Sequence, residues 1–267
     1  MELTELALLA VVAVAAGAVN GAVGSGSLIT LPALLSLGFS PASALVTNTI
    51  GILFSAVGGT LRYREDLAAE GTALRSLMVM SGLGAAVGAS ALLVSPPGAL
   101  QVVVPFLIVL AILLVVLQPM IVRALARRRE RRAAVGETRP GADRGPYGSR
   151  GLQASMFGAS IYGGYFTAAQ GILYMGVLGS FTGRPLGEVN GPKNLLSAIV
   201  NLVAAVFYTV AFFLGHADVV WVASAAIGLG AVVGGYLGAD IAKRLPSVVL
   251  RGVIVVVALF ALVRELT

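Results

Sequence analysis

The sequence predicts an all-α polytopic membrane protein with two inverted-topology repeats, each a broken, re-entrant helical hairpin followed by three transmembrane helices. Three observations support this fold. Hydrophobic residues make up 58% of the 267 residues, whereas charged residues make up 11%. Apolar runs of about 20 residues, each long enough to cross the hydrocarbon core as a helix, recur along the chain. A glycine-containing motif also appears once in each half.

The expected membrane segments are two hairpins and six full crossings. Hairpins are expected at about 4–37 and 152–182, where glycines interrupt apolar sequence. The crossings are expected near 41–60, 76–95, 99–122, 187–213, 219–240 and 248–264. Acidic Glu2 and Glu5, rather than basic residues, precede the first apolar stretch, which argues against a cleaved signal peptide. We therefore expect this stretch to be retained as the first membrane segment.

Positive charge is concentrated between the two halves. Nine arginines lie between Arg123 and Arg150, in sequence that also contains glycine and proline. We expect a cytoplasmic linker at 123–150, between a first membrane repeat at 1–122 and a second at 151–267. A nucleic-acid arm is the alternative, but the positive-inside rule explains the arginines better in a membrane protein. We expect no nucleic-acid partner.

The remaining basic residues favour hairpins that enter and leave on one side of the cell membrane. With hairpins, every basic residue except Lys193 and Arg264 is cytoplasmic, and both termini lie outside. Single crossings are the alternative, and they would move Lys243, Arg244 and Arg251 to the outer side. The charge distribution therefore favours hairpins.

The repeated motif is GLGAAVG at Gly82–Gly88 and GLGAVVG at Gly228–Gly234, an offset of 146 residues. An offset of 142 pairs Asn20–Ser27 with Tyr162–Ala169 more weakly. Helices rich in Gly, Ala and Val can also resemble each other through composition alone. Inverted repeats whose broken segments meet at the midplane are the architecture of many secondary transporters.

The first hairpin carries a candidate anion site at its break, where Asn20 precedes Ser25, Gly26 and Ser27. We expect the last three to begin a short helix whose free N–H groups and positive dipole end suit an anion. A plain kink is the alternative. The stretch is not a phosphate loop, because no Gly-Lys-Ser/Thr follows the glycines.

The second hairpin has polar residues at the matching depth, beside a Gly-Gly pair. These residues are Tyr162, Tyr165, Thr167 and Gln170. Tyrosines also serve as interfacial anchors, so the expectation that they line a cavity depends on their clustering.

The stretch NGPKNLLSAIVN places five polar residues on one narrow helix face: Asn190, Lys193, Asn194, Ser197 and Asn201. The repeat register puts Thr47 and Asn48 on the corresponding face of the first half. Because a lipid-facing polar stripe is costly, we expect both faces to point into the protein and to line the substrate site. Lys193 is the one basic residue expected within a span. It could instead snorkel to the interface or pair with Glu188.

Several classes of function are excluded. The chain has no cysteine and one histidine, His216, so disulfides, thiolate metal sites and His-cluster metal sites are excluded. No hydrolase or metalloprotease motif and no carboxylate pair within a span is present, so we expect no enzyme, no catalytic residue and no cofactor. A carrier for a small anion fits best, because a cation carrier would need intramembrane carboxylates.

The sequence resembles the sulfite exporter TauE/SafE family over nearly its whole length except the arginine-rich linker. The resemblance is carried by GSGS with a following proline, by YGGYF, by the lysine-asparagine pair in NGPKNLLSAIVN and by the GGYLGADIAKRLPSVVLRGVIVVV tail. It implies export of a small sulfur-containing anion, sulfite or an organosulfonate. Members usually have a Gly-Ala-Gly type turn after the Tyr-Phe pair, whereas this chain has Thr167-Ala168-Ala169-Gln170. The second tip therefore differs in geometry or substrate preference.

We expect the anion to bind near the midplane, between the two hairpin tips and the two polar faces. The expected partners are this substrate and membrane lipid, and a homodimer is one open oligomeric state. The alternative function is a non-transporting membrane scaffold or assembly factor that docks partners through the arginine-rich loop.

Overall fold

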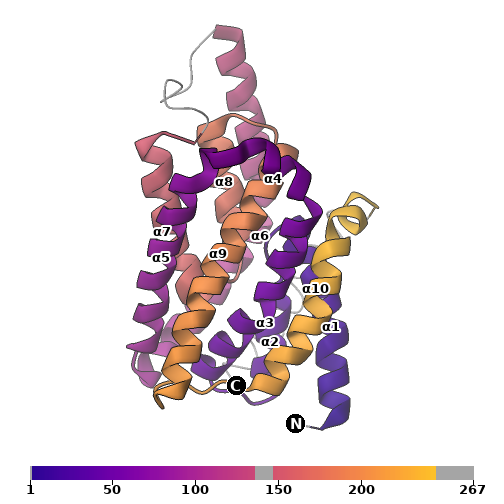
Figure 1. The fold of residues 1–267 in the computed structure, drawn as a ribbon, viewed down its shortest axis with the longest axis vertical. Helices are drawn as coiled ribbons and strands as arrows, with labels where there is room; N and C mark the ends of the chain where they lie inside the picture. Colours follow the sequence, from indigo (N-terminus) through magenta and orange to yellow (C-terminus); the bar gives the residue numbers. More distant parts are fainter. Residues whose placement is uncertain (1, 136–146, 245–267) are drawn as a thin grey trace.

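The computed structural model describes residues 2–135 and 147–244 (Figure 1). Every element in these two stretches is helical. The elements are α1 (Leu3–Ala22), α2 (Ser27–Ser36), α3 (Pro41–Arg62), α4 (Arg64–Glu70), the 3-10 helix η1 (Gly71–Leu74), α5 (Arg75–Leu93), α6 (Pro97–Val135), α7 (Arg150–Phe166), α8 (Gln170–Thr182), α9 (Leu186–Phe213) and α10 (Trp221–Arg244). The predicted crossing at 248–264 lies outside the described residues.

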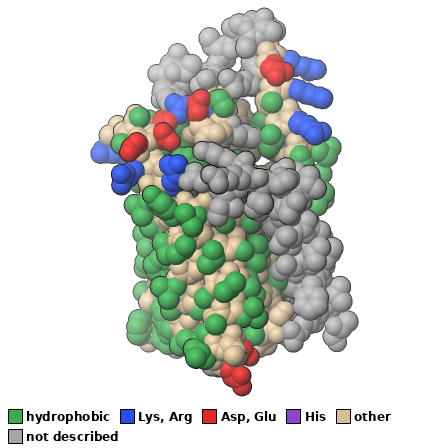
Figure 2. Space-filling model, turned by 90° about the vertical axis from the view of Figure 1, so that its right-hand side faces the viewer, with side chains coloured by type: hydrophobic (Ala, Val, Ile, Leu, Met, Phe, Trp, Pro, Cys, Tyr) green, Lys and Arg blue, Asp and Glu red, His purple; other side chains and the backbone are tan. Residues whose placement is uncertain are grey.

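Long apolar helices coincide with the expected crossings at 41–60, 76–95, 99–122 and 187–213 and with the start of the first expected hairpin, whereas the apolar helix at Trp221–Leu237 is shorter. Among the described residues, five helices are long and apolar enough to cross a membrane. Figure 2 shows hydrophobic side chains covering the middle of the molecule, while Lys and Arg gather at one end. The exposed Arg62 and Arg64, where α3 gives way to α4, belong to this charged end. The structure is therefore that of a multi-pass helical membrane protein.

The first predicted hairpin is interrupted between α1 and α2. Gly24 has φ +84°, a left-handed conformation that glycine adopts without steric cost. Helix α2 then folds back against α1 and continues through Pro32. The break predicted at the glycines is thus confirmed.

The second predicted hairpin is interrupted between α7 and α8. Here the positive φ angles belong to Thr167 (62°) and Ala169 (58°), neither of which is glycine. A β-branched residue in this region is an outlier that its surroundings must hold in place. The departure of this tip from the family pattern therefore coincides with an unusual backbone.

The two hairpin tips touch each other through their backbones. The N–H of Gly171 donates a hydrogen bond to the carbonyl of Gly24, with an N···O distance of 3.0 Å. A Cβ atom added to either glycine would overlap the backbone of the other. Two segments almost 150 residues apart in sequence therefore meet at a point where no side chain fits.

The repeated glycine motif makes corresponding contacts in the two halves. Gly84 and Gly88 of α5 pack directly on backbone carbonyls of α7, and Gly230 and Gly234 of α10 pack on backbone carbonyls of α1. In both halves the motif therefore holds the first helix of a hairpin in close contact, as small residues do between membrane helices.

Close backbone contacts of the two hairpins occur at positions that differ from those the weaker sequence match pairs. Gly17 packs on the backbone of Ala231, and Gly164 packs on the backbone of Ala85. These contacts, like the Gly24–Gly171 pair, relate the two hairpins by 147 residues. They do not follow the offset of 142 seen between NGAVGSGS and YGGYFTAA, which stays a prediction.

The start of the predicted linker is helical. Helix α6 continues to Val135, 13 residues beyond the predicted end of the first repeat at 122. Residues 123–135 consist of Arg, Ala, Leu, Glu and Val, most of which are strong helix formers, and no glycine or proline interrupts them. The arginine-rich sequence therefore extends a membrane helix out of its apolar portion.

Candidate functional site

Lys193 lies at the centre of the predicted polar face and is completely buried in α9. Its Nζ donates to the carbonyl of Asn20 at 3.3 Å and to that of Gly21 at 3.1 Å. Asn194 Nδ2 donates to the same Gly21 oxygen at 3.3 Å. These carbonyls belong to the last turn of α1, where a helix has no N–H partners of its own and carries a partial negative charge. Lys193 and Asn194 therefore cap the C-terminal end of α1.

This arrangement replaces both of the alternatives that the sequence left open for Lys193. Its burial is incompatible with snorkelling to the interface. Glu188 is exposed, and among the described residues no carboxylate forms an ion pair with Lys193. The ammonium group is held by backbone carbonyls contributed from the other half of the chain.

Asn20 connects three helices beside this cap. Its Nδ2 donates to Ser55 Oγ of α3 at 3.2 Å, and its Oδ1 accepts the Gly26 N–H at 3.3 Å. Ser55 Oγ in turn donates to the carbonyl of Gly17 at 3.1 Å. Asn20 therefore links the end of α1 to α3 and to the start of α2.

Unpaired polar atoms lie at the start of α2. Ser25 and Ser27 are each 1% exposed, and neither Oγ has a hydrogen-bond partner. Asn48 of α3 is fully buried. Its Oδ1 accepts a hydrogen bond from Thr30, but its Nδ2 is unpaired. Buried polar groups without partners are uncommon and costly, so this cluster needs an explanation.

The second tip supplies further polar groups. Thr167 Oγ1 lies 3.0 Å from Thr49 Oγ1 and donates to the carbonyl of Gly163 at 3.1 Å, which secures the unusual backbone. Tyr162 donates its hydroxyl to the carbonyl of Ala168 at 2.7 Å. Gln170 is 2% exposed, and its Nε2 has no partner.

Three predicted site residues make their contacts elsewhere. Thr47 Oγ1 accepts the Val220 N–H at 3.1 Å, which caps the start of α10. The hydroxyl oxygen of Tyr165 lies 3.1 Å from Oγ of Ser95, a residue just beyond the end of α5. Asn190 donates to the hydroxyl of Tyr63 at 3.0 Å, next to the charged end. These three side chains bind helix ends and connections rather than the hairpin tips.

The inward orientation of the two polar faces is confirmed. On α9, Lys193, Asn194, Ser197 and Asn201 are all buried, and the Oδ1 atom of Asn201 has no partner. The corresponding face of α3 is buried as well, and the two helices pack against each other.

Sequence analysis missed several polar partners at the tips. They are Thr30, Thr49 and Tyr208, the last donating to the carbonyl of Gly164 at 2.6 Å. Thr30 follows Ser27 by one helical turn, so spacing could have indicated it. Thr49 and Tyr208 lie off the predicted stripes and carry no such signal.

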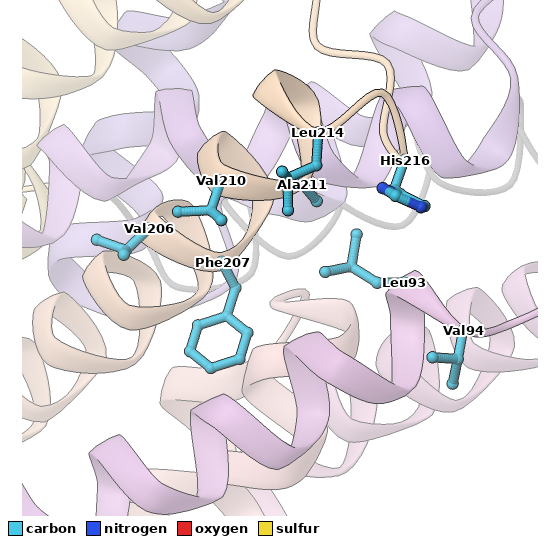
Figure 3. A pocket seen from close by; sticks show the side chains of 8 residues that line it. All are labelled: Leu93, Val94, Val206, Phe207, Val210, Ala211, Leu214 and His216. Carbon is cyan, nitrogen blue, oxygen red and sulfur yellow. The ribbon is translucent and has the colours of Figure 1, made fainter.

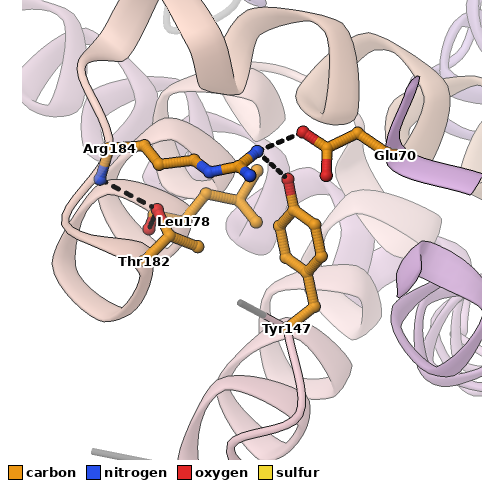
Figure 4. A network of polar contacts seen from close by, with 5 residues as sticks. All are labelled: Glu70, Tyr147, Leu178, Thr182 and Arg184. Atoms are coloured by element: carbon orange, nitrogen blue, oxygen red, sulfur yellow. Dashed lines mark hydrogen bonds and ion pairs between the residues drawn. The ribbon is translucent and has the colours of Figure 1, made fainter. Parts of the chain in front are cut away.

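A separate polar network closes the charged end (Figure 4). Arg184 forms an ion pair with Glu70 and donates to the hydroxyl of Tyr147 at 2.9 Å. Burial lowers the pKa of Arg184, but the hydrogen bond to Glu70 and the neighbouring charges outweigh this effect and raise it. Burial also raises the pKa of Tyr147, although the charge of Arg184 opposes the shift. Through these contacts Arg184, which follows α8, connects the end of α4 to the segment that precedes α7.

One apolar cavity of the described residues is unsuited to an anion. It has a volume of about 410 Å³ and lies where α5 and α9 end (Figure 3). Its lining is apolar apart from His216, and comprises Leu93, Val94, Val206, Phe207, Val210, Ala211 and Leu214. Apolar walls supply no hydrogen bonds to a small anion, so the candidate site remains at the hairpin tips.

Comparison with known proteins agrees with this architecture. The family described as Sulfite exporter TauE/SafE matches residues 9–264. The chain belongs to this family. It is 26% identical over 240 residues to the probable membrane transporter protein YfcA of Escherichia coli K12, covering 90% of this chain and 80% of that protein. It is 33% identical over 114 residues to the probable membrane transporter protein ORF9 of Sinorhizobium sp., covering 43% and 44% of the two chains. No solved structure matches.

Proposed function

We propose that the protein is a secondary transporter that exports a small sulfur-containing anion, sulfite or an organosulfonate, through a site between the two hairpin tips. The observation that carries this proposal is Lys193, a fully buried cation within a membrane-spanning helix. None of the ion pairs among residues 2–135 and 147–244 gives it a carboxylate partner. Intramembrane ionisable residues mark substrate pathways by default. Its positive charge and the unpaired donors nearby favour an anion.

The proposed architecture is a pair of inverted repeats. Support comes from the corresponding glycine contacts, in which α5 holds α7 and α10 holds α1. It also comes from the direct contact between Gly24 and Gly171, which are equivalent positions of the two hairpins. In transporters built this way, substrate sites lie where broken helices meet.

The proposed orientation places the charged end in the cytoplasm of the cell and both termini outside. The positive-inside rule supports it, because arginines gather at the end where α6 emerges (Figure 2). A negative cell interior then favours export, since the membrane potential contributes about 2.3 kcal/mol per charge per 100 mV. An exported anion therefore needs no coupling ion.

The test is anion flux in liposomes that contain the purified full chain. Lys193→Met removes the charge but keeps the apolar stem, and we expect it to abolish sulfite flux. Arg75→Met is the matched control, because Arg75 is exposed at the start of α5, and we expect it to keep wild-type flux. Wild-type flux in Lys193→Met would refute the site.

A matched deletion separates transport from the scaffold alternative. Deleting residues 127–146 removes most of the arginine-rich sequence through which a scaffold would dock its partners and none of the candidate site residues. We expect this variant to transport sulfite normally. Loss of cellular function in this variant, with Lys193→Met unaffected, would favour the scaffold.

A further inference from the structure

The break in the first hairpin brings two opposite helix ends together. The C-terminal end of α1 presents the carbonyls of Asn20 and Gly21, and the N-terminal end of α2 begins at Ser27. The two ends carry partial charges of opposite sign, which cancel in part for any ligand that approaches them. An anion is attracted only if the negative end is neutralised.

Lys193 and Asn194 provide this neutralisation. Both donate to the carbonyls of α1, at distances of 3.1 to 3.3 Å. The positive end of α2 has no comparable counter-charge among the described residues, since no ionised carboxylate pairs there. The electrostatic balance of the tip is therefore shifted toward attraction of an anion at the start of α2.

Three unpaired groups lie at that end of α2 or on α3, the helix that packs against its first turn. Ser25 Oγ and Ser27 Oγ are buried there without partners, and Asn48 Nδ2 is the third. Thr30 donates to Asn48 Oδ1, which fixes this amide against α2 and leaves its N–H₂ group free. Ser27 precedes Thr30 by one helical turn, so the two side chains are neighbours on one face. Asn48 is therefore held against the first turn of α2, the turn that also carries Ser27.

We propose that the start of α2 is the oxygen-binding subsite of the transporter, where Ser25, Ser27 and Asn48 donate hydrogen bonds to the anion. Lys193 is then a positioning residue that neutralises the end of α1 and does not touch the anion. This division of roles rests on the proposed function. Three separate donors suit an anion with several oxygens, such as a sulfonate or sulfite, better than a halide ion.

The experiment measures binding to the purified full chain by calorimetry, with methanesulfonate as the oxyanion and chloride as the competing halide. The test variant is Ser25→Ala/Ser27→Ala. The control is Ser180→Ala, whose hydroxyl bonds to the carbonyl of Gly176 in its own helix. We expect the double variant to bind methanesulfonate at least about tenfold more weakly, because each hydrogen bond to a charged group is lost. The chloride affinity of the double variant should stay within about twofold of the wild-type value. Ser27→Thr keeps a hydroxyl and should retain methanesulfonate binding.

Lys193→Gln separates the charge from the cap, because glutamine can still donate to carbonyls. We expect it to weaken the binding of methanesulfonate and of chloride by the same factor, so that the ratio of the two affinities stays unchanged. The inference is overturned if Ser25→Ala/Ser27→Ala leaves the ratio of methanesulfonate to chloride affinity unchanged. It is also overturned if Lys193→Gln changes this ratio, which is the result expected if Lys193 contacted the anion directly. If the wild-type chain binds no anion, the proposed function itself fails.

Discussion

The contact between the two hairpin tips can be tested by giving Gly24 a side chain. Gly24 has φ +84°, so alanine at this position adopts a left-handed conformation that costs about 1–2 kcal/mol. Its Cβ would also overlap the backbone of Gly171, so the tips must separate. Separation removes the Gly171–Gly24 hydrogen bond, worth about 1 kcal/mol, and adds about 1–3 kcal/mol of overpacking. We expect Gly24→Ala to destabilise the protein by about 3–6 kcal/mol.

Two matched variants divide this cost into its parts. Gly38 has almost the same backbone conformation, φ +85°, but a Cβ there meets nothing within 4 Å. Gly38→Ala therefore reports the conformational cost alone. Gly171→Ala reports the overlap without a positive φ. If the tips touch as described, the loss in Gly24→Ala should approximate the sum of the two other losses.

The assay is unfolding of the purified chain in detergent, followed by the fluorescence of Trp221, the single tryptophan. We expect Gly24→Ala to have a clearly lower midpoint than Gly38→Ala. Equal midpoints for these two variants would show that the hairpin tips do not meet, and the proposed site between them would lose its basis.

Two further predictions concern helix packing and pH. Gly84→Val should destabilise the α5–α7 contact by several kcal/mol, because a Cβ at Gly84 overlaps the backbone of α7 and Ser160. Gly82→Val is the control, since a Cβ at Gly82 has its nearest neighbours at 3.9 Å. Equal unfolding midpoints for the two variants would contradict this packing. Burial raises the pKa of Tyr147, so the folded protein keeps a proton that the unfolded chain loses, and stability should fall as pH rises above about 10. Tyr147→Phe should make this alkaline loss less steep in unfolding experiments, and an unchanged slope would contradict the assignment.

Sequence reasoning located the helices well because membrane segments are governed by local rules. Apolar length determines a span, and glycines mark a break, so the interruptions near Gly24 and after Tyr165 could be predicted. The end of α6 could not be placed from charge alone. Arginine is both a marker of the cytoplasmic side and a strong helix former, and helix propensity determines the structure up to Val135.

The partners of the site residues were harder to predict, because they depend on contacts between the halves. Helical spacing correctly indicated that Lys193 is buried. Its acceptors are backbone carbonyls 172 and 173 residues away, and no side-chain pattern in the sequence marks a carbonyl as an acceptor. Thr47 lies on the predicted face, and its contact with the start of α10 likewise depends on the other half of the chain.

The pairing of α1 with α10 has a consequence for biosynthesis. Helix α1 makes its most extensive contact with α10, which begins about 200 residues later at Trp221. At a synthesis rate of about 5–20 residues per second, α10 is made roughly 10–40 seconds after α1. During this interval the small-residue surface of α1, including Gly17 and Gly21, faces lipid or insertion machinery. Neither half can complete its own packing, so the chain becomes a finished protein only when its last described helix is in place.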